Sequence, residues 1–138
     1  LLESQKMTEQ EAECIRIRDI RRFVESGLGQ RMKKAAMKKH LYREQPFVIQ
    51  RNASMLDDGW KNETVLVQGI IDAYFMEEEE IVLVDYKTDR VKRGQEQKLI
   101  DLYHVQLEDY ARALERMTGK RVKEKIIYSF TLQKEILL

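Results

Sequence analysis

The chain has 138 residues, enough for one domain with a hydrophobic core and too few for two, so we expect a single domain. Its 25 lysines and arginines are balanced by 24 aspartates and glutamates, which excludes a global positive field directed at nucleic acid or an anionic membrane. A lone cysteine excludes an internal disulfide, and no apolar run approaches the ~20 residues of a membrane span, so we expect a cytoplasmic protein.

The first forty residues are predicted to form two helices. Thr8 and Glu11 have the spacing of a capping box, and apolar residues follow at helical intervals, which predicts a helix over residues 9–25. Residues 26–29 contain two glycines and predict a break, with a second helix over residues 30–39. Basic side chains surround the apolar positions of this second helix. Such a cluster is typical of a solvated helix face, and it is also suited to binding phosphates.

Three strands are predicted in the middle of the chain. Residues 41–50 form the first, and Pro46, the only proline, indicates an edge position or a bulge. Residues 51–62 are polar and turn-rich, which predicts a loop. Residues 64–76 and 81–88 have apolar side chains at both odd and even positions, as in strands whose two faces are both covered. They are predicted to form a hairpin through residues 77–80.

The last third of the chain predicts a charged loop, a helix over residues 98–118 with Gly119 as its C-cap, and a strand over residues 122–131. The last strand follows a helical crossover, so it can lie parallel to the strand over residues 81–88. The sequence therefore predicts an α/β fold with a mixed central β-sheet and helices on both faces. The predicted buried stripe of the long helix consists of Leu102, Val105, Tyr110, Ala113, Leu114 and Met117.

Two carboxylates and an ammonium fall at the ends of the two central strands. Asp85 and Lys87 are two residues apart, so in a strand both side chains leave the same face. A carboxylate on a buried strand is costly unless something pairs with it, and an ion pair with Lys87 or an arginine would explain Asp85 alone. The addition of Asp72 on the preceding strand favours a functional site. Gln106 and Tyr110 are four residues apart in the following helix and share one face of it.

Four motifs carry a resemblance to a known family. They are residues 42–47 (YREQPF), 68–72 (QGIID), 84–89 (VDYKTD) and 106–114 (QLEDYARAL). With these motifs the chain resembles the RecB-like branch of the PD-(D/E)XK nuclease superfamily, in particular the C-terminal nuclease domains of AddA-type helicase/nuclease proteins. The resemblance extends over nearly the whole chain. It implies a restriction-endonuclease-like core over residues 41–138, preceded by a helical lead-in over residues 1–40.

The resemblance also implies the chemistry. It implies a magnesium-dependent DNA exonuclease, part of a helicase/nuclease that processes double-strand breaks for recombinational repair. Asp72, Asp85 and the backbone carbonyl of Tyr86 would bind Mg²⁺, with Mn²⁺ as an alternative, because hard oxygen ligands suit these ions. Lys87 would orient the attacking water and offset charge at the scissile phosphate.

Further residues and partners follow from the same resemblance. Gln106 and Tyr110 would face the catalytic cleft and hold the DNA backbone or the lysine, although packing of the helix on the sheet would explain them equally well. The implied partners are an AddB-type subunit and DNA, fed as a single strand from an unwound duplex. The alternative is a catalytically inactive nuclease fold that guides DNA or docks a partner protein, and an RNA-cleaving enzyme stays open.

The chain departs from the family pattern in one respect. Enzymes of this branch commonly place a histidine metal ligand on a helix before the first strand, and residues 1–39 contain no histidine. The simplest interpretation is a piece of a longer protein that begins after that histidine. His40 and His104 are interpreted as structural or exposed, and Glu44, at a family position near the site, as an exposed strand residue.

Overall fold

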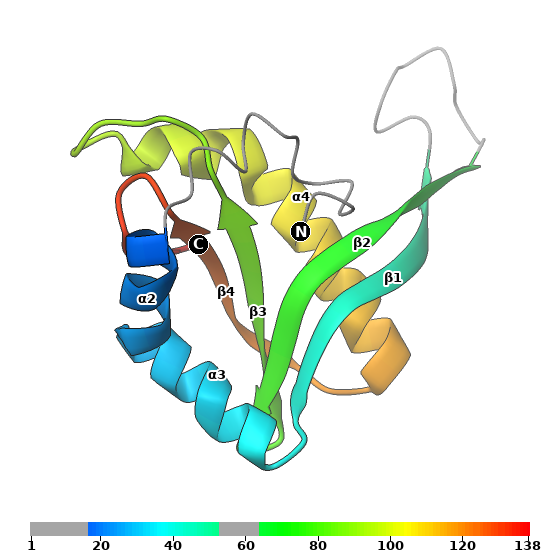
Figure 1. Cartoon of the computed structure of the whole chain (residues 1–138). Coiled ribbons are helices and arrows are strands. Elements are labelled where there is room, and N and C mark those ends of the chain that lie inside the picture. The colour runs from blue at the N-terminus through cyan, green and yellow to red at the C-terminus, as the bar shows by residue number, and fades with distance from the viewer. Residues whose placement is uncertain (1–16, 53–63) are drawn as a thin grey trace.

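The structure is a computed structural model, and it describes residues 17–52 and 64–138. Helices α2 (Ile17–Glu25) and α3 (Gly27–Met37) precede the strands β1 (Leu41–Asn52), β2 (Thr64–Glu77) and β3 (Glu80–Lys87). Helix α4 (Glu96–Thr118) then leads to β4 (Val122–Ser129) and β5 (Lys134–Leu137). These five strands form one sheet in the order β1-β2-β3-β4-β5, and Figure 1 labels the first four of them. Among the strands of the described residues, only β3 and β4 pair in parallel, so the predicted mixed sheet is confirmed.

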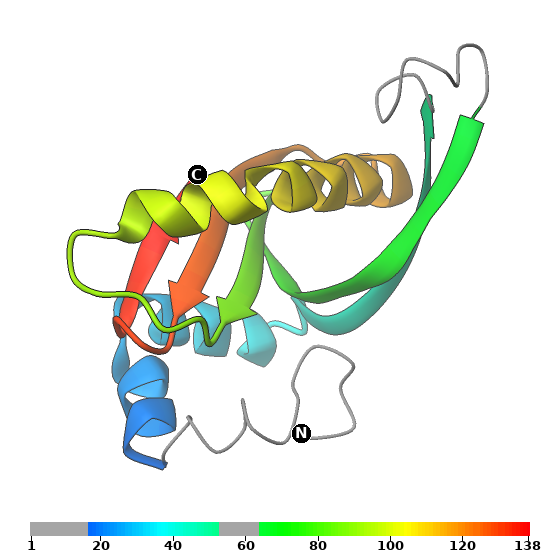
Figure 2. The same cartoon turned by 90° about the horizontal axis from the view of Figure 1, so that it is seen from above.

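The sheet is covered on both faces. Helix α4 lies on one side of it, and α2 and α3 lie on the other (Figure 2). Successive residues of β3 supply the two cores: Ile81 and Leu83 pack in the cluster on the α4 side, whereas Val82 and Val84 pack in the cluster on the α3 side. Because side chains alternate along a strand, an unbroken apolar run is what a strand between two helical layers requires.

The hairpin of β1 and β2 projects beyond the rest of the sheet as a curved ribbon (Figure 2). Strand β1 is an edge strand and contains Pro46, as the sequence predicted, since a residue without an N–H is tolerated there. Its pairing with β2 is interrupted at Glu44, whose φ of 49° lies in the left-handed region. The edge strand is therefore locally irregular beside Asp72, the residue that the register places opposite Glu44.

The first helical boundary differs from the prediction. The break is confined to Ser26, and the two glycines lie inside α3 rather than before it. Ser26 is the N-cap of α3, and its Oγ accepts a hydrogen bond from the Gly29 N–H at 3.0 Å. A capping serine therefore starts the helix despite the two glycines. The predicted helix over residues 9–25 does end at Glu25, and its first eight residues lie outside the described part of the chain.

Gly29 is required by the close approach of the two helices. A Cβ at this position would lie 2.1 Å from the Phe23 carbonyl oxygen and 2.6 Å from that of Val24. We expect Gly29→Ala to lower the free energy of unfolding by roughly 1–3 kcal/mol, because the backbone of α2 must move. Gly27→Ala is the matched control, since its Cβ would meet only Glu135 Oε2 at 3.7 Å. Urea unfolding measures both variants, and equal stabilities would contradict this account.

The buried stripe of α4 also differs from the prediction. Tyr110, Ala113 and Leu114 are buried as predicted, but Leu102, Val105 and Met117 are 61%, 43% and 48% exposed. Leu99 and Leu107 are buried in their place. The stripe is rotated because polar residues, Gln106 among them, occupy part of the helix face that meets the sheet.

The C-terminal segment contains a strand that the sequence did not predict. The predicted strand over residues 122–131 ends at Ser129, and after a turn β5 pairs antiparallel with β4. Gly119 is the C-cap of α4 with a φ of 71°, in the left-handed conformation that glycine adopts without strain.

Among the described residues, no helix is long and apolar enough to cross a membrane.

Candidate active site

The candidate site lies where β2 and β3 separate. Their last paired residues are Ala73 and Val84, and one further step in the same register brings Asp72 opposite Asp85. Beyond this point β2 continues with β1 alone, while β3 continues with β4 (Figure 1). Asp72 Oδ2 accepts a hydrogen bond from the Tyr86 backbone N–H at 2.9 Å. The Asp72 carboxylate thus lies against the backbone of β3 between Asp85 and Lys87.

Asp85 and Lys87 form an ion pair at the end of β3. The Asp85 side chain is fully buried, that of Lys87 is 13% exposed, and Lys87 Nζ lies 2.8 Å from Asp85 Oδ2. Alternation along β3 places both residues on the α4 side, in line with Ile81 and Leu83. The burial cost of the carboxylate is offset by this ammonium, so the loss of either partner is expensive.

Helix α4 brings two residues to the lysine. Lys87 Nζ donates a hydrogen bond to Gln106 Oε1 at 3.0 Å, and it lies 3.9 Å from the centroid of the Tyr103 ring. The Tyr103 hydroxyl in turn donates to Asp89 Oδ2 at 2.8 Å. Sequence reasoning missed Tyr103 and Asp89. The signal for Tyr103 was its position three residues before Gln106, on the same helix face.

Tyr110 lies one turn further along α4, in the hydrophobic core. Its ring packs edge-on against Phe47 of β1, with 5.0 Å between the centroids and an interplanar angle of 67°. Gln106 and Tyr110 do share a helix face, but they contact different parts of the sheet. Gln106 lies against Lys87 at the end of β3, whereas Tyr110 lies against Phe47 of β1. This packing is the alternative that the sequence left open for Tyr110, and a catalytic role for Tyr110 stays a prediction.

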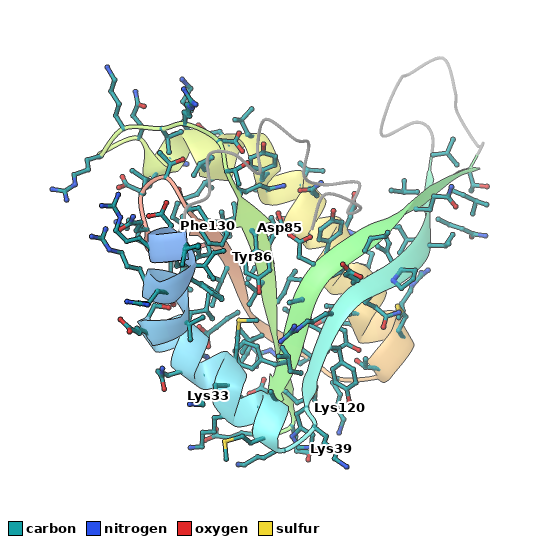
Figure 3. All side chains as sticks on the ribbon, in the orientation of Figure 1. Lys33, Lys39, Asp85, Tyr86, Lys120 and Phe130 are labelled. Atoms are coloured by element: carbon teal, nitrogen blue, oxygen red, sulfur yellow. The ribbon has the colours of Figure 1, made fainter. Side chains whose placement is uncertain are left out.

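The side chain of Tyr86 points away from the two carboxylates. It packs on the opposite side of the sheet with Phe23 and Phe130, at centroid distances of 5.5 and 5.9 Å (Figure 3). Burial, and then the negative charge of Asp72, raise the pKa of the Tyr86 phenol to about 12, so it stays protonated at neutral pH. Tyr86 therefore contributes to the site through its backbone.

The basic residues of α3 do not reach this site. Lys33 of α3, and Lys39 just after this helix, lie toward the opposite end of the molecule from Asp85 (Figure 3). His40 and His104 are both exposed, as the sequence predicted. Glu44 is exposed as well, although the β1–β2 register places it opposite Asp72. The candidate chemistry thus lies where β2 and β3 diverge, beside the facing side of α4; Asp85 and Lys87 are at the end of β3, whereas Asp72 lies inside β2 and not at its end as the sequence predicted.

The donor atoms at this site suit a hard divalent cation. In the described part of the chain, no three His, Cys, Asp or Glu side chains are grouped closely enough to hold a metal ion. The candidate donors are the Asp72 and Asp85 carboxylates and the Tyr86 carbonyl. Mg²⁺ is commonly bound by one or two carboxylates, with water and substrate phosphate completing its shell. An all-oxygen set of this size fits that ion.

Comparison with known proteins identifies the family. A sequence model of the PD-(D/E)XK nuclease superfamily matches residues 3–136. The chain belongs to the PD-(D/E)XK nuclease superfamily. The fold is accordingly of the restriction-endonuclease-like α/β class, as the sequence predicted.

Curated relatives of this PD-(D/E)XK domain are named as subunits of an ATP-dependent helicase/nuclease, the AddA type. One from Clostridium novyi is 40% identical over 141 residues, which covers 99% of this chain and 11% of the relative. One from Acetivibrio thermocellus is 46% identical over 129 residues, covering 90% of this chain and 10% of the relative. The chain thus spans about a tenth of the length of these relatives. The resemblance to helicase/nuclease proteins of this kind is confirmed.

Proposed function

We propose that this nuclease domain hydrolyses phosphodiester bonds of DNA with the help of Mg²⁺, or of Mn²⁺ in its place. The observation that carries the proposal is the arrangement at the end of β3. Two carboxylates occupy opposite positions on separating strands, and a nearly buried ammonium lies 2.8 Å from one of them. A site for phosphate cleavage needs negative oxygens to hold a metal ion and a cation for the substrate, and both are side by side here.

Each side chain has a part in this proposal. Asp72 and Asp85 would hold the ion, together with the Tyr86 carbonyl. Such an ion, when bound, would lower the pKa of its water and offset charge on the phosphate. Lys87 would orient the attacking water and donate to an oxygen of the scissile phosphate. Gln106 keeps the ammonium in place through the 3.0 Å hydrogen bond.

The wider role rests on the relatives. Their name describes an ATP-dependent helicase joined to a nuclease, and we propose that residues 1–138 are the single nuclease domain of such a protein. In this setting the domain would act as an exonuclease on a single strand delivered by the motor. An AddB-type protein would be its partner, and the process would be the repair of double-strand breaks in the cytoplasm.

One observation favours a second candidate, a nuclease fold that guides DNA or docks a partner protein without cleaving. Within the described residues, no third metal-binding side chain joins Asp72 and Asp85. If the two carboxylates hold the ion too weakly, the domain would bind DNA without hydrolysing it. Metal-dependent cleavage separates the two candidates.

Removal of the metal tests the proposal. We expect the full-length protein that contains this domain to release nucleotides from linear single-stranded DNA with Mg²⁺ present, and to stop when a chelator is added. Single-stranded DNA without ATP is the substrate of choice, because the motor is then not needed and its own requirement for Mg²⁺ does not interfere. Cleavage that persists in excess chelator would overturn the metal-dependent mechanism. DNA binding without any cleavage would support the second candidate.

A further inference from the structure

The Lys87 ammonium is held by groups from two elements. Its Nζ lies 2.8 Å from Asp85 Oδ2 on β3, 3.0 Å from Gln106 Oε1 on α4 and 3.9 Å from the centroid of the Tyr103 ring on α4. A cation within about 6 Å of the centroid of an aromatic ring is attracted by the negative face of that ring, most strongly where water is excluded. At 13% exposure Lys87 is in such a place.

The Tyr103 side chain is held by a hydrogen bond from its hydroxyl and by packing of its ring. Its hydroxyl donates to Asp89 Oδ2 at 2.8 Å, and its partly buried ring packs against the core on the α4 side of the sheet. Asp89 follows Lys87 by two residues, just after β3 ends. The hydrogen bond therefore ties the segment after β3 to α4 and sets the ring over the ammonium.

A metal ion and Lys87 would share the Asp85 carboxylate. Any cation bound by Asp85 meets the ammonium that already lies against Oδ2. Of the contacts described for the ammonium, those with Gln106 and Tyr103 do not involve a proposed metal ligand. The contacts of Lys87 with Gln106 and Tyr103 can therefore persist when Asp85 binds a metal ion.

We propose that Tyr103 is a positioning residue, whose ring face holds the Lys87 ammonium beside the metal site while Asp89 fixes the ring. The proposal rests on the proposed function, because it assigns Tyr103 a part in the same reaction. Without the ring, Lys87 relies more on Asp85, so it competes more strongly with the metal ion and is less well placed for the phosphate. Simple packing of Tyr103 in the core would have neither effect.

The kinetic test compares two substitutions of Tyr103 in the full-length protein on single-stranded DNA. Tyr103→Leu removes the ring, and we expect kcat to fall about tenfold with KM unchanged. Tyr103→Phe keeps the ring face and loses only the hydroxyl, so its kcat should stay within about threefold of the wild type. Wild-type kcat in Tyr103→Leu would overturn the proposal. Equal losses in both variants would also overturn it, since they would assign the effect to the hydroxyl.

A binding measurement gives a readout that is independent of turnover. Mn²⁺ is titrated into the nucleotide-free protein, and the Asp85→Asn variant is used to subtract binding at other sites. Tyr103→Leu should weaken the apparent affinity about threefold, whereas Tyr103→Phe should not change it. Tyr42→Leu is the matched control, because Tyr42 is an exposed tyrosine of β1 that stacks on Tyr74 of β2. Unchanged affinity in Tyr103→Leu, or the same loss in Tyr42→Leu, would contradict the proposal.

Asp89 provides a further check. Asp89→Ala and Tyr103→Phe remove the same hydrogen bond, so the kcat of the double variant should equal that of the worse single variant. Additive losses would mean that Asp89 acts separately from the ring, and they would overturn its assigned part.

The two proposals fail in different ways. If Asp85→Asn cleaves DNA as fast as the wild type, the proposed function fails, and with it the inference. If Asp85→Asn is inactive while Tyr103→Leu matches the wild type in kcat and in Mn²⁺ affinity, only the inference about Tyr103 fails.

Discussion

Asp85→Asn is expected to reduce DNA cleavage by at least about 100-fold, because even groups that merely orient a metal ligand are worth 10–100-fold in affinity or activity. The substitution is nearly isosteric and keeps an oxygen that can accept a hydrogen bond from Lys87. It removes the negative charge of a fully buried carboxylate. This carboxylate is one of only two that are proposed to bind the metal ion. The rate of nucleotide release from single-stranded DNA at saturating Mg²⁺ is the measurement.

A matched control separates charge loss at the site from charge loss elsewhere. Asp101 is an exposed residue of α4 whose Oδ1 accepts a hydrogen bond from Gln97 at 2.9 Å, and Asp101→Asn should cleave at the wild-type rate. Thermal unfolding of both variants shows whether the fold is kept, since Asp85→Asn leaves the Lys87 ammonium without its counter-charge. Equal cleavage rates for Asp85→Asn and Asp101→Asn would rule out Asp85 as a metal ligand.

The central hairpin of the fold could be predicted because its sequence signals agree with one another. Strands β2 and β3 are rich in β-branched and apolar residues, and the turn between them is short and charged. A two-residue separation fixes the relative direction of Asp85 and Lys87 in any strand, and the short turn fixes the register that brings Asp72 opposite Asp85. Local rules therefore predicted the shared face of Asp85 and Lys87 and the hairpin that brings Asp72 near them, without knowledge of the helices, whereas the register itself was not predicted.

The helix face opposite them could not be predicted in this way. The spacing of apolar residues predicted a buried face of α4 that includes Leu102 and Val105, but both side chains are exposed. The face that meets the sheet contains Tyr103 and Gln106, which contact Lys87. A polar contact between distant segments adds nothing to the apolar periodicity of a helix, and functional sites are where rules based on sequence alone are expected to fail. Tyr103 was missed for the same reason that the stripe was misplaced.

The short strand β5 was missed for a different reason. Its four residues are too few to show alternation, and it is stabilised by pairing with β4 rather than by its own composition. The missed strand has no bearing on the site, because β5 lies at the far edge of the sheet from β2.

Lys87→Met is expected to produce opposite changes in cleavage and in metal affinity. Removal of the ammonium should lower the rate of DNA cleavage by roughly 100- to 1,000-fold, the usual cost of losing one preorganised donor to a developing negative charge. The same change frees Asp85 Oδ2 from the cation that lies 2.8 Å away, so Mn²⁺ should bind several-fold more tightly. A lysine that served only as a structural counter-charge would change metal affinity without a large effect on catalysis.

Stability provides the third measurement on this variant. Without metal, Lys87→Met leaves the fully buried Asp85 carboxylate without that ammonium, and breaking such a pair costs about 3–5 kcal/mol. Binding of Mg²⁺ to the folded state should return part of this free energy, so the unfolding temperature of Lys87→Met should rise with added Mg²⁺ more than that of the wild type. The double variant Asp85→Asn with Lys87→Met removes the buried charge, and it should be more stable than Lys87→Met and insensitive to Mg²⁺. If Mg²⁺ stabilises the double variant as much as it stabilises Lys87→Met, the ion is bound elsewhere. The Asp85 carboxylate beside Lys87 is then not the metal site.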